Sequence, residues 1–462
     1  MAPAEMRSIR VHDTRSGELV QLRPREAGRV GIYACGPTVY GRIHIGNARP
    51  FVVFMLLKRL LEHEGLDTRL VVNITDVNDK IYAAAGEQGR ASAELAAEMA
   101  DLYRADTDAL GLGRPDHEPL ASQTMQAIID HIAALVQAGH AYAAGGDVYF
   151  RVRSDPLYGS LSHRHLEDMD QGEGLEGAEH KRDPLDFALW KAHKPDEDTV
   201  WDSPWGPGRP GWHIECSAMA EELLGVGFEV HGGGSDLVFP HHENEAAQTR
   251  AARGTELAQV WMHNGMIQLT GEKMAKSLGN IAPLHEVLAQ HGRDTVVMYL
   301  VSGHYRQPLA FSDSELQSAG RGVARLREAL GHLRAGEPSP PDMVAHKEAF
   351  FDGLATDFNT PAALSSMFEW VREANRRGGE AGDGDLREML AVLGLGDLEP
   401  LRAAGGQAAM DPRAKELLDE RELARARRDF ATADAIREQL RALGWEIRDG
   451  PQGPELLASA RR

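Results

Sequence analysis

The sequence predicts an α/β protein, in which a parallel-sheet domain split by an insertion is followed by a helical domain and a small C-terminal domain of mixed α/β structure. Three observations lead to this fold class. A strand, a helix and a second strand follow one another over residues 29–75, a stretch rich in Gly, Pro and charged residues spans about 112–205, and helical stripes of apolar residues recur from residue 312 onward. A strand–helix–strand unit implies a parallel sheet with a ligand crevice at the carboxyl ends of its strands.

Length and composition exclude several classes of protein. A chain of 462 residues has room for roughly three domains, and 42% hydrophobic with 26% charged residues is ordinary globular usage. The longest apolar stretch, residues 51–61, is interrupted by two basic residues and is too short to span a bilayer. The net charge of −20 argues against a general nucleic-acid binder. The first ten residues lack the apolar run of a signal peptide, so we expect a cytoplasmic protein.

Three consecutive segments predict the first unit of the sheet. Residues 29–34 alternate apolar and polar residues, as a strand does, and end at a Cys-Gly-Pro turn. Residues 51–64 carry apolar side chains at helical spacing, and residues 68–75 form the apolar run of a buried strand. After the insertion, residues 228–231 predict another strand, which runs into three glycines.

Helix-start signals organise the second half of the chain. Ser312 and Glu315 form the two ends of a capping box, and residues 360–361 place a proline at the first turn of a further helix. Residues 445–448 and 454–457 are expected to pair as a short hairpin. We therefore expect helices first and a small mixed unit at the end.

Two motifs predict a nucleotide site. HIGN at residues 44–47 stands at the start of the first helix, and KMAKS at residues 273–277 lies in a loop between glycines. A helix N-terminus favours phosphate, and two lysines can offset the charge that develops on a departing pyrophosphate. Taken alone, the first motif would be an ordinary helix start and the second a charged loop. The candidate nucleotide-binding residues are His44, Gly46, Asn47, Lys273 and Lys276.

Two cysteines and a His/Glu run predict a metal site. His241 and Glu245 are four residues apart, so on a helix they project from one face, and the thiolates of Cys35 and Cys216 would complete a tetrahedral site that suits zinc. In the alternative, the cysteines are small buried hydrophobes and the His/Glu run is a solvated helix face. Without a CxxC pair, the residues alone leave this alternative open.

The order of HIGN and KMAKS resembles the two signatures of class I aminoacyl-tRNA synthetases. Ala275 stands where the second signature usually has Ser, which leaves both lysines in place. Residues 35–40, 211–217 and 232–245 resemble the cysteinyl-tRNA synthetase family, and the similarity covers nearly the whole chain, weakening in the insertion and around 375–408. This resemblance implies that the two cysteines, His241 and Glu245 hold a single zinc ion.

The resemblance also implies a domain plan and an activity. It implies a Rossmann-like catalytic domain at 1–311, with the insertion at about 112–205 and the KMAKS loop at 271–279, a helical bundle at 312–404 and a tRNA anticodon-binding domain at 405–462. The implied activity is ATP-dependent ligation of L-cysteine to tRNA(Cys) through a cysteinyl-adenylate, with Mg²⁺ accompanying ATP. The implied amino-acid pocket contains Gly36, Thr75, Trp212, His231 and Asp236. We expect a monomer rather than an oligomer.

Two other functions stay open. The cysteine ligase of mycothiol biosynthesis would share the activation chemistry and the zinc, but it resembles a shortened synthetase, whereas this chain keeps the residues after Gly405. A zinc-dependent hydrolase would need an open coordination position and a general base, and would give the two lysines no task.

A basic face is expected in the C-terminal part. Arg421, Arg425 and Arg428 share one face of a predicted helix, although acidic neighbours would also suit an ordinary solvated helix. With a synthetase resemblance ahead of it, this face is expected to contact the tRNA backbone.

Overall fold

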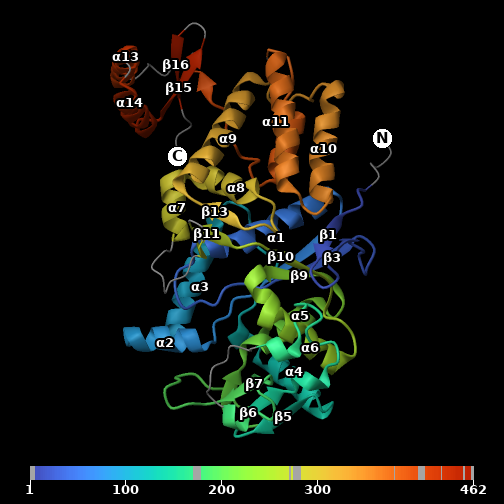
Figure 1. Cartoon of the computed structure of the whole chain (residues 1–462). Helices are drawn as coiled ribbons and strands as arrows, with labels where there is room; N and C mark the ends of the chain where they lie inside the picture. Colours follow the sequence, from blue (N-terminus) through green and yellow to red (C-terminus); the bar gives the residue numbers. More distant parts are fainter. Residues whose placement is uncertain are drawn as a thin grey trace.

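The computed structural model describes residues 6–169, 178–269, 272–273, 282–378, 380–403, 412–427, 429–450 and 453–458. Figure 1 shows a sheet in the middle of the molecule, a second sheet at one end, a group of helices at the other end and a small C-terminal unit beside those helices. Within the described part of the chain, no helix is long and apolar enough to cross a membrane.

The central sheet is parallel, as predicted. It has four strands in the order β10 (Ala258–Asn264), β9 (Phe228–Gly234), β3 (Arg29–Ala34) and β4 (Asp67–Val72). All neighbouring strands run in the same direction, and β3 pairs with β9 on one side and with β4 on the other. The carboxyl ends of the strands therefore meet at one edge, and a short antiparallel pair, β1 (Arg10–Asp13) and β2 (Glu18–Gln21), precedes them.

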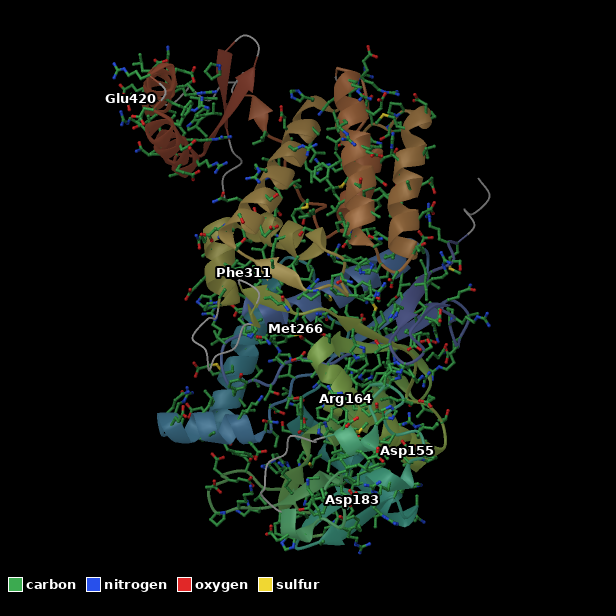
Figure 2. All side chains as sticks on the ribbon, viewed as in Figure 1. Asp155, Arg164, Asp183, Met266, Phe311 and Glu420 are labelled. Atoms are coloured by element: carbon green, nitrogen blue, oxygen red, sulfur yellow. The ribbon has the colours of Figure 1, made fainter. Side chains whose placement is uncertain are left out.

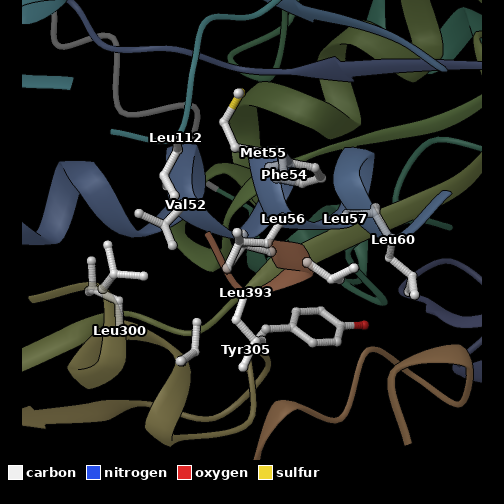
Figure 3. Close-up of a cluster of buried hydrophobic side chains, with 14 of the residues drawn as sticks. Val52, Phe54, Met55, Leu56, Leu57, Leu60, Leu112, Leu300, Tyr305 and Leu393 are labelled. Carbon is white, nitrogen blue, oxygen red and sulfur yellow. The ribbon is translucent and has the colours of Figure 1, made fainter. Parts of the chain in front are cut away.

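Helix α1 (Ile45–His63) connects β3 to β4 and is buried along most of its length. It starts six residues before the apolar run at 51–64, because His44 caps it and Pro50 is accommodated inside it. Its apolar side chains meet Leu300 and Leu393 from other parts of the chain (Figure 3). The core is continuous from the central sheet into the helices that follow, since one buried cluster extends from Ile9 to Leu398.

The segment between β4 and β9 builds a second sheet. Two helices come first, α2 (Asp79–Gln88) and α3 (Ser92–Asp108), and parallel bridges from Val71 to His117 and from Ile74 to Leu120 keep the next residues beside the central sheet. The second sheet is antiparallel and contains β5 (Ala141–Ala144), β6 (Asp147–Phe150), β7 (Phe187–Ala192) and β8 (Gly208–Pro210). Its core includes residues of α4 (Met125–Gln137), α5 (Trp212–Leu224) and α6 (Glu243–Arg253).

A small mixed sheet contains β11 (Ile267–Leu269), β12 (Glu272–Lys273) and β13 (Leu309–Phe311), and the first two helices of the helical part lie in the chain between β12 and β13. The helices of this part are α7 (Leu284–His291), α8 (Arg293–Ser302), α9 (Asp313–His332), α10 (Val344–Ala355), α11 (Thr360–Arg376) and α12 (Gly384–Val392). One half of the predicted capping box of α9 is confirmed, because the Ser312 hydroxyl accepts a hydrogen bond from the Glu315 backbone N–H at 3.3 Å, and of the two bonds of such a box the described helix start shows this one alone.

The C-terminal unit has its own small core. Helices α13 (Pro412–Ala426) and α14 (Phe430–Ala442) pack with the hairpin β15 (Trp445–Gly450) and β16 (Gly453–Ala458), and β14 (Arg402–Ala403) pairs with β16. The predicted hairpin is confirmed. The domain limits inferred from the sequence stay a prediction.

The predicted basic face of α13 is wrong in one of its members. Arg421 is only 4% exposed and pairs with Glu422, so its guanidinium lies in the packing of this unit and not on a solvent face. Arg425 is exposed, and Arg428 lies outside the described residues. Helix α13 therefore does not expose all three arginines for contact with phosphates.

Candidate active site and metal centre

The candidate site residues gather at the carboxyl edge of the parallel sheet. Cys35 follows β3, and its backbone N–H donates to the Gly232 carbonyl of β9 at 2.9 Å. His231 lies in β9, and Thr75 lies just beyond β4, where its carbonyl accepts from the Val39 N–H at 3.1 Å. This edge is where parallel sheets with crossover helices bind their ligands.

Four buried side chains form a possible metal site. Ligand atoms of Cys35, His241, His242 and Glu245 all lie within 4.8 Å of one another. His241 Nε2 is 3.0 Å from Glu245 Oε1, and Cys35 Sγ is 3.6 Å from the same oxygen. The i, i+4 spacing of His241 and Glu245 works as expected, because the turn before α6 continues into that helix.

Cys216 lies beside this group on α5. It is buried, and burial raises the pKa of its thiol, which also interacts with the thiol of Cys35. Of the sequence-predicted ligand residues, the structure thus groups Cys35, His241 and Glu245, places Cys216 next to Cys35, and adds His242. The histidine doublet was the available signal for His242, since it stands three residues before Glu245 and shares its helix face.

The donor set fits a cation. Glu245 Oε2 and His242 Nε2 are buried without a hydrogen-bond partner among the described residues. Burial lowers the pKa of His241 and of His242 well below the usual value, so both imidazoles are neutral, which is the form that binds metals. Burial, and then the hydrogen bond with Cys216, raises the pKa of Cys35. Bound positive charge would offset the cost of a carboxylate and thiolates in this enclosed place.

A second layer of side chains orients the two histidines. His213 Nδ1 lies 3.0 Å from His241 Nδ1, which leaves the other ring nitrogen of His241 facing Glu245. His263 Nε2 lies 2.6 Å from His242 Nδ1, and the Thr14 hydroxyl lies 2.7 Å from His263 Nδ1. Such outer contacts fix ring orientation in metal sites. Sequence reasoning assigned no role to His213, although it lies in the segment 211–217 that resembles the family, and it missed His263, because both contacts depend on how separate elements pack.

The predicted amino-acid pocket residues divide into three groups. Trp212 stacks on His241 with ring centroids 4.3 Å apart, and His231 Nε2 lies 3.2 Å from Glu245 Oε2, so both border the cluster. Gly36 is required where it stands, because a Cβ there would lie 1.7 Å from the Asn73 carbonyl oxygen. Thr75 Oγ1 accepts from the Asn73 amide at 3.3 Å, which places it beside Gly36. Asp236 is exposed, in a short turn after β9.

The HIGN motif folds into the N-terminus of α1. His44 Nδ1 accepts from the Gly46 N–H at 3.1 Å, and the Asn47 side chain accepts from the His44 N–H at 3.1 Å, which completes a capping box. Because Nδ1 is an acceptor, the proton of the neutral ring is on Nε2. The backbone of Lys273 pairs with Gln268, and Lys276 lies outside the described residues.

Models of protein families match most of the chain. The model described as "tRNA synthetases class I (C) catalytic domain" matches residues 21–321, the "DALR domain" matches 349–396, and the "Cysteinyl-tRNA ligase anticodon binding domain" matches 407–454. A curated protein of Heliobacterium modesticaldum named "Cysteine--tRNA ligase" is 45% identical over 96% of this chain and 98% of its own length. The chain belongs to the cysteinyl-tRNA synthetase family.

Further comparisons agree with this membership. A "Cysteine--tRNA ligase" of Halorhodospira halophila is 44% identical over 96% of this chain and 98% of its own length. Among solved structures, a Mycobacterium tuberculosis methionyl-tRNA synthetase in complex with methionyl-adenylate superposes with a TM-score of 0.59 at 17% identity, covering 80% of this chain and 88% of that one. A LeuRS of Agrobacterium radiobacter in a ternary complex has a TM-score of 0.60 at 13% identity, covering 82% and 84%. These likenesses confirm the predicted class I, Rossmann-like fold.

Proposed function

We propose that this chain ligates L-cysteine to tRNA(Cys) with ATP, through a cysteinyl-adenylate. The observation that carries the proposal is the buried Cys/His/Glu cluster at the carboxyl edge of the sheet, in a chain that is 45% identical over nearly its full length to a cysteine–tRNA ligase. The edge also receives the N-terminus of α1, where an anionic nucleotide is favoured.

The cluster is proposed to hold a single Zn²⁺ through Cys35, Cys216, His241 and Glu245. When bound, the ion supplies a Lewis acid for the thiolate of the substrate, which serine cannot replace. The neutral rings and the contact of the two thiols support this ligand set. His242 stays outside it in the proposal, because its Nε2 lies 3.8 Å from Glu245 Oε1, whereas the Nε2 of His241 lies 3.0 Å from the same oxygen.

The pocket residues are proposed to bind the rest of cysteine. Trp212 stacks on His241 and so limits the space beside the thiol. Gly36, Thr75 and His231 line the adjoining end of the sheet, and Asp236 supplies a carboxylate for the substrate ammonium. A thiol-specific contact is needed, because an apolar pocket separates near-isosteres by only about 10²-fold.

Activation is proposed to depend on positioning and charge. The cysteine carboxylate attacks the α-phosphate of ATP, and pyrophosphate leaves with the bridging oxygen. The 2′-hydroxyl of the tRNA then attacks the acyl carbon and gives up its proton, the acyl–phosphate bond breaks, and AMP leaves. His44, through its Nε2–H, together with Gly46 and Asn47, binds phosphate at the start of α1. Lys273 and Lys276 offset the charge that grows on the pyrophosphate, with Mg²⁺ carried by ATP.

The alternative functions have less support. The mycothiol ligase would share activation, but residues 407–454 match an anticodon-binding model, which an amino-sugar acceptor would not use. In a zinc-dependent hydrolase, the capped HIGN end of α1 would have no role in the reaction.

Cysteine-dependent ATP–pyrophosphate exchange followed by charging of purified tRNA species tests the proposal. Exchange with cysteine and charging of tRNA(Cys) is the expected result. Exchange without charging of any tRNA would point to the amino-sugar ligase, and absence of exchange in metal-loaded protein would refute the proposed activation reaction.

A further inference from the structure

Arg49 lies in α1 two residues after the HIGN motif, and its side chain is completely buried, with 0% of its surface exposed. Its Nη1 donates to the carbonyls of Gly265 at 2.5 Å and Met266 at 3.4 Å, and its Nη2 donates to the carbonyl of His304 at 3.2 Å. One guanidinium therefore joins the start of α1 to two separate links of the chain.

Burial of this guanidinium carries a cost in free energy. Within the described part of the chain, the hydrogen-bond partners of Arg49 are backbone carbonyls and not carboxylates, and its Nε has no hydrogen-bond partner. Burial lowers the pKa of Arg49 to about 10, which leaves it protonated at neutral pH. A buried cation held only by carbonyls carries a desolvation cost that an apolar residue would avoid. What the arginine contributes is the geometry of a planar fork with several donors.

The two links contacted by Arg49 lead directly into strands of the small sheet that carries Lys273. Gly265 and Met266 connect β10 to β11, and β11 pairs with β12, where Gln268 lies opposite Lys273. His304 belongs to the link between α8 and β13, which pairs with β11 on its other side. Figure 2 labels Met266, next to β11, and Phe311, the last residue of β13.

The two links are also packed on each other. The Gly265 N–H donates to the Tyr305 carbonyl at 2.7 Å, and a Cβ at Gly265 would lie 2.4 Å from the Gln307 backbone. On the far side, Asp357 at the junction of α10 and α11 accepts from the Tyr305 hydroxyl at 2.9 Å and from Arg306 Nε at 2.8 Å. The helical part and α1 therefore hold the same link from opposite sides.

We propose that Arg49 is a positioning residue of the activation step, which sets the placement of the Lys273 strand pair relative to the HIGN end of α1. The inference rests on the proposed function, because the distance between these motifs matters only if both bind one ATP. A small misplacement of charged groups around a transferring phosphoryl group is enough to cost roughly 10- to 100-fold in rate.

Arg49→Lys is the direct test. A lysine keeps the charge but cannot reach both links with a planar fork, so the kcat of cysteine-dependent pyrophosphate exchange should fall roughly 10- to 100-fold. The KM for cysteine should change by less than about twofold and the zinc content should not change, because Arg49 touches none of the cluster residues.

Arg59→Lys is the matched control. Arg59 lies in the same helix, donates only to the carbonyls of Ala391 at 3.1 Å and Leu112 at 3.0 Å, and likewise has an Nε without a partner in the described residues. Burial lowers its pKa too. The two variants should lose similar amounts of thermal stability, but Arg59→Lys should keep the exchange kcat of the parent protein.

Asp357→Asn provides an independent test of the proposal if Arg49→Lys is recovered unfolded. Asp357 has a φ of 60°, which asparagine tolerates. The variant removes the negative charge that pairs with Arg306, while an amide oxygen can still accept from the Tyr305 hydroxyl and the His12 backbone N–H. It should lower the exchange kcat several-fold at unchanged cysteine KM. An unchanged kcat in either folded variant, or an equal loss in Arg49→Lys and Arg59→Lys, would overturn the proposal. Absence of exchange in the parent protein would instead refute the proposed function.

Discussion

Glu245 is the residue on which the candidate metal centre converges. Its carboxylate lies within 3.8 Å of one nitrogen on each of His231, His241 and His242 and 3.6 Å from the Cys35 sulfur. A carboxylate in so buried a place is stable only with a proton or a cation beside it. The side chains that could bind a cation are therefore concentrated around Glu245.

The ligand set can be tested by exchanging the two neighbouring histidines in turn. His241→Gln should leave less than about 0.2 zinc per chain, because a proposed direct ligand is lost, whereas His242→Gln should keep most of the metal. Elemental analysis of protein purified without added metal is the measurement. Equal losses in both variants would place His242 among the ligands.

A pH effect is expected from His63 at the end of α1. Hydrogen bonds to Glu388 at 2.9 Å and Glu64 at 3.2 Å raise the pKa of His63 to about 9. The pKa of this histidine in the unfolded chain is about 6.5. The interaction of protonated His63 with the two glutamates therefore stabilises the fold fully below pH 6.5, and this contribution is lost as the pH rises through 9.

Substitution of His63 should therefore flatten the pH dependence. Because Glu388 is partly exposed, we expect the free energy of unfolding of the parent protein to fall about 1 kcal/mol more than that of His63→Gln between pH 6.5 and 9.5. Urea unfolding at these two pH values measures it. Parallel curves for the two proteins would contradict this assignment.

Residue patterns predicted part of the site. The i, i+4 pair His241 and Glu245 was predictable because helical spacing fixes their shared face. His213 and His263 were not, because their contact with the pair depends on how three elements pack. Arg421 was placed wrongly, since helical spacing shows which side chains share a face but not which face is buried.

At the scale of single elements, local residue patterns and capping side chains determine where helices and strands begin and end. Strand β3 and the C-terminal hairpin fall where alternation and turn residues predicted them. Helix α1 begins earlier than its apolar run, because the cap by His44 outweighs the presence of Pro50 inside the helix. The pairing of β9 between β3 and β10 joins distant segments, and no local pattern contains that order.

The cap of α9 gives a prediction at this scale. Ser312→Ala removes the acceptor for the Glu315 N–H and should lower the free energy of unfolding by about 1 kcal/mol. Ser318→Ala, at an exposed position inside the same helix, should be neutral or slightly stabilising because alanine is the better helix former. Denaturant unfolding of both variants measures this, and equal effects would refute the cap.

For the whole molecule, the structure separates a large body from a small C-terminal unit. The core of the body runs continuously from the central sheet into α12, whereas Leu417, Ile436, Leu440 and Trp445 belong to a second core. The backbone N–H of Leu401 still donates to Arg327 in α9 at 3.0 Å, so the body ends there.

A chain that stops after Leu401 should separate the two half-reactions. Cysteine-dependent exchange and zinc content should stay close to those of the full chain, because the sheet edge and both motifs remain. Charging of tRNA should fall sharply, because the segment that matches an anticodon-binding model is gone and the remaining acidic body repels the polyanion. Full charging by a truncated chain with normal exchange would show that the C-terminal unit does not bind tRNA.

The central claim is that a metal-bound thiol contact at the sheet edge selects cysteine for activation. The most direct measurement is the ratio of kcat/KM for cysteine and serine in pyrophosphate exchange by the metal-loaded protein. Selection by a thiolate–metal contact predicts a ratio above roughly 10⁴. A ratio of about 10² or less, which an apolar pocket alone could give, would contradict the account.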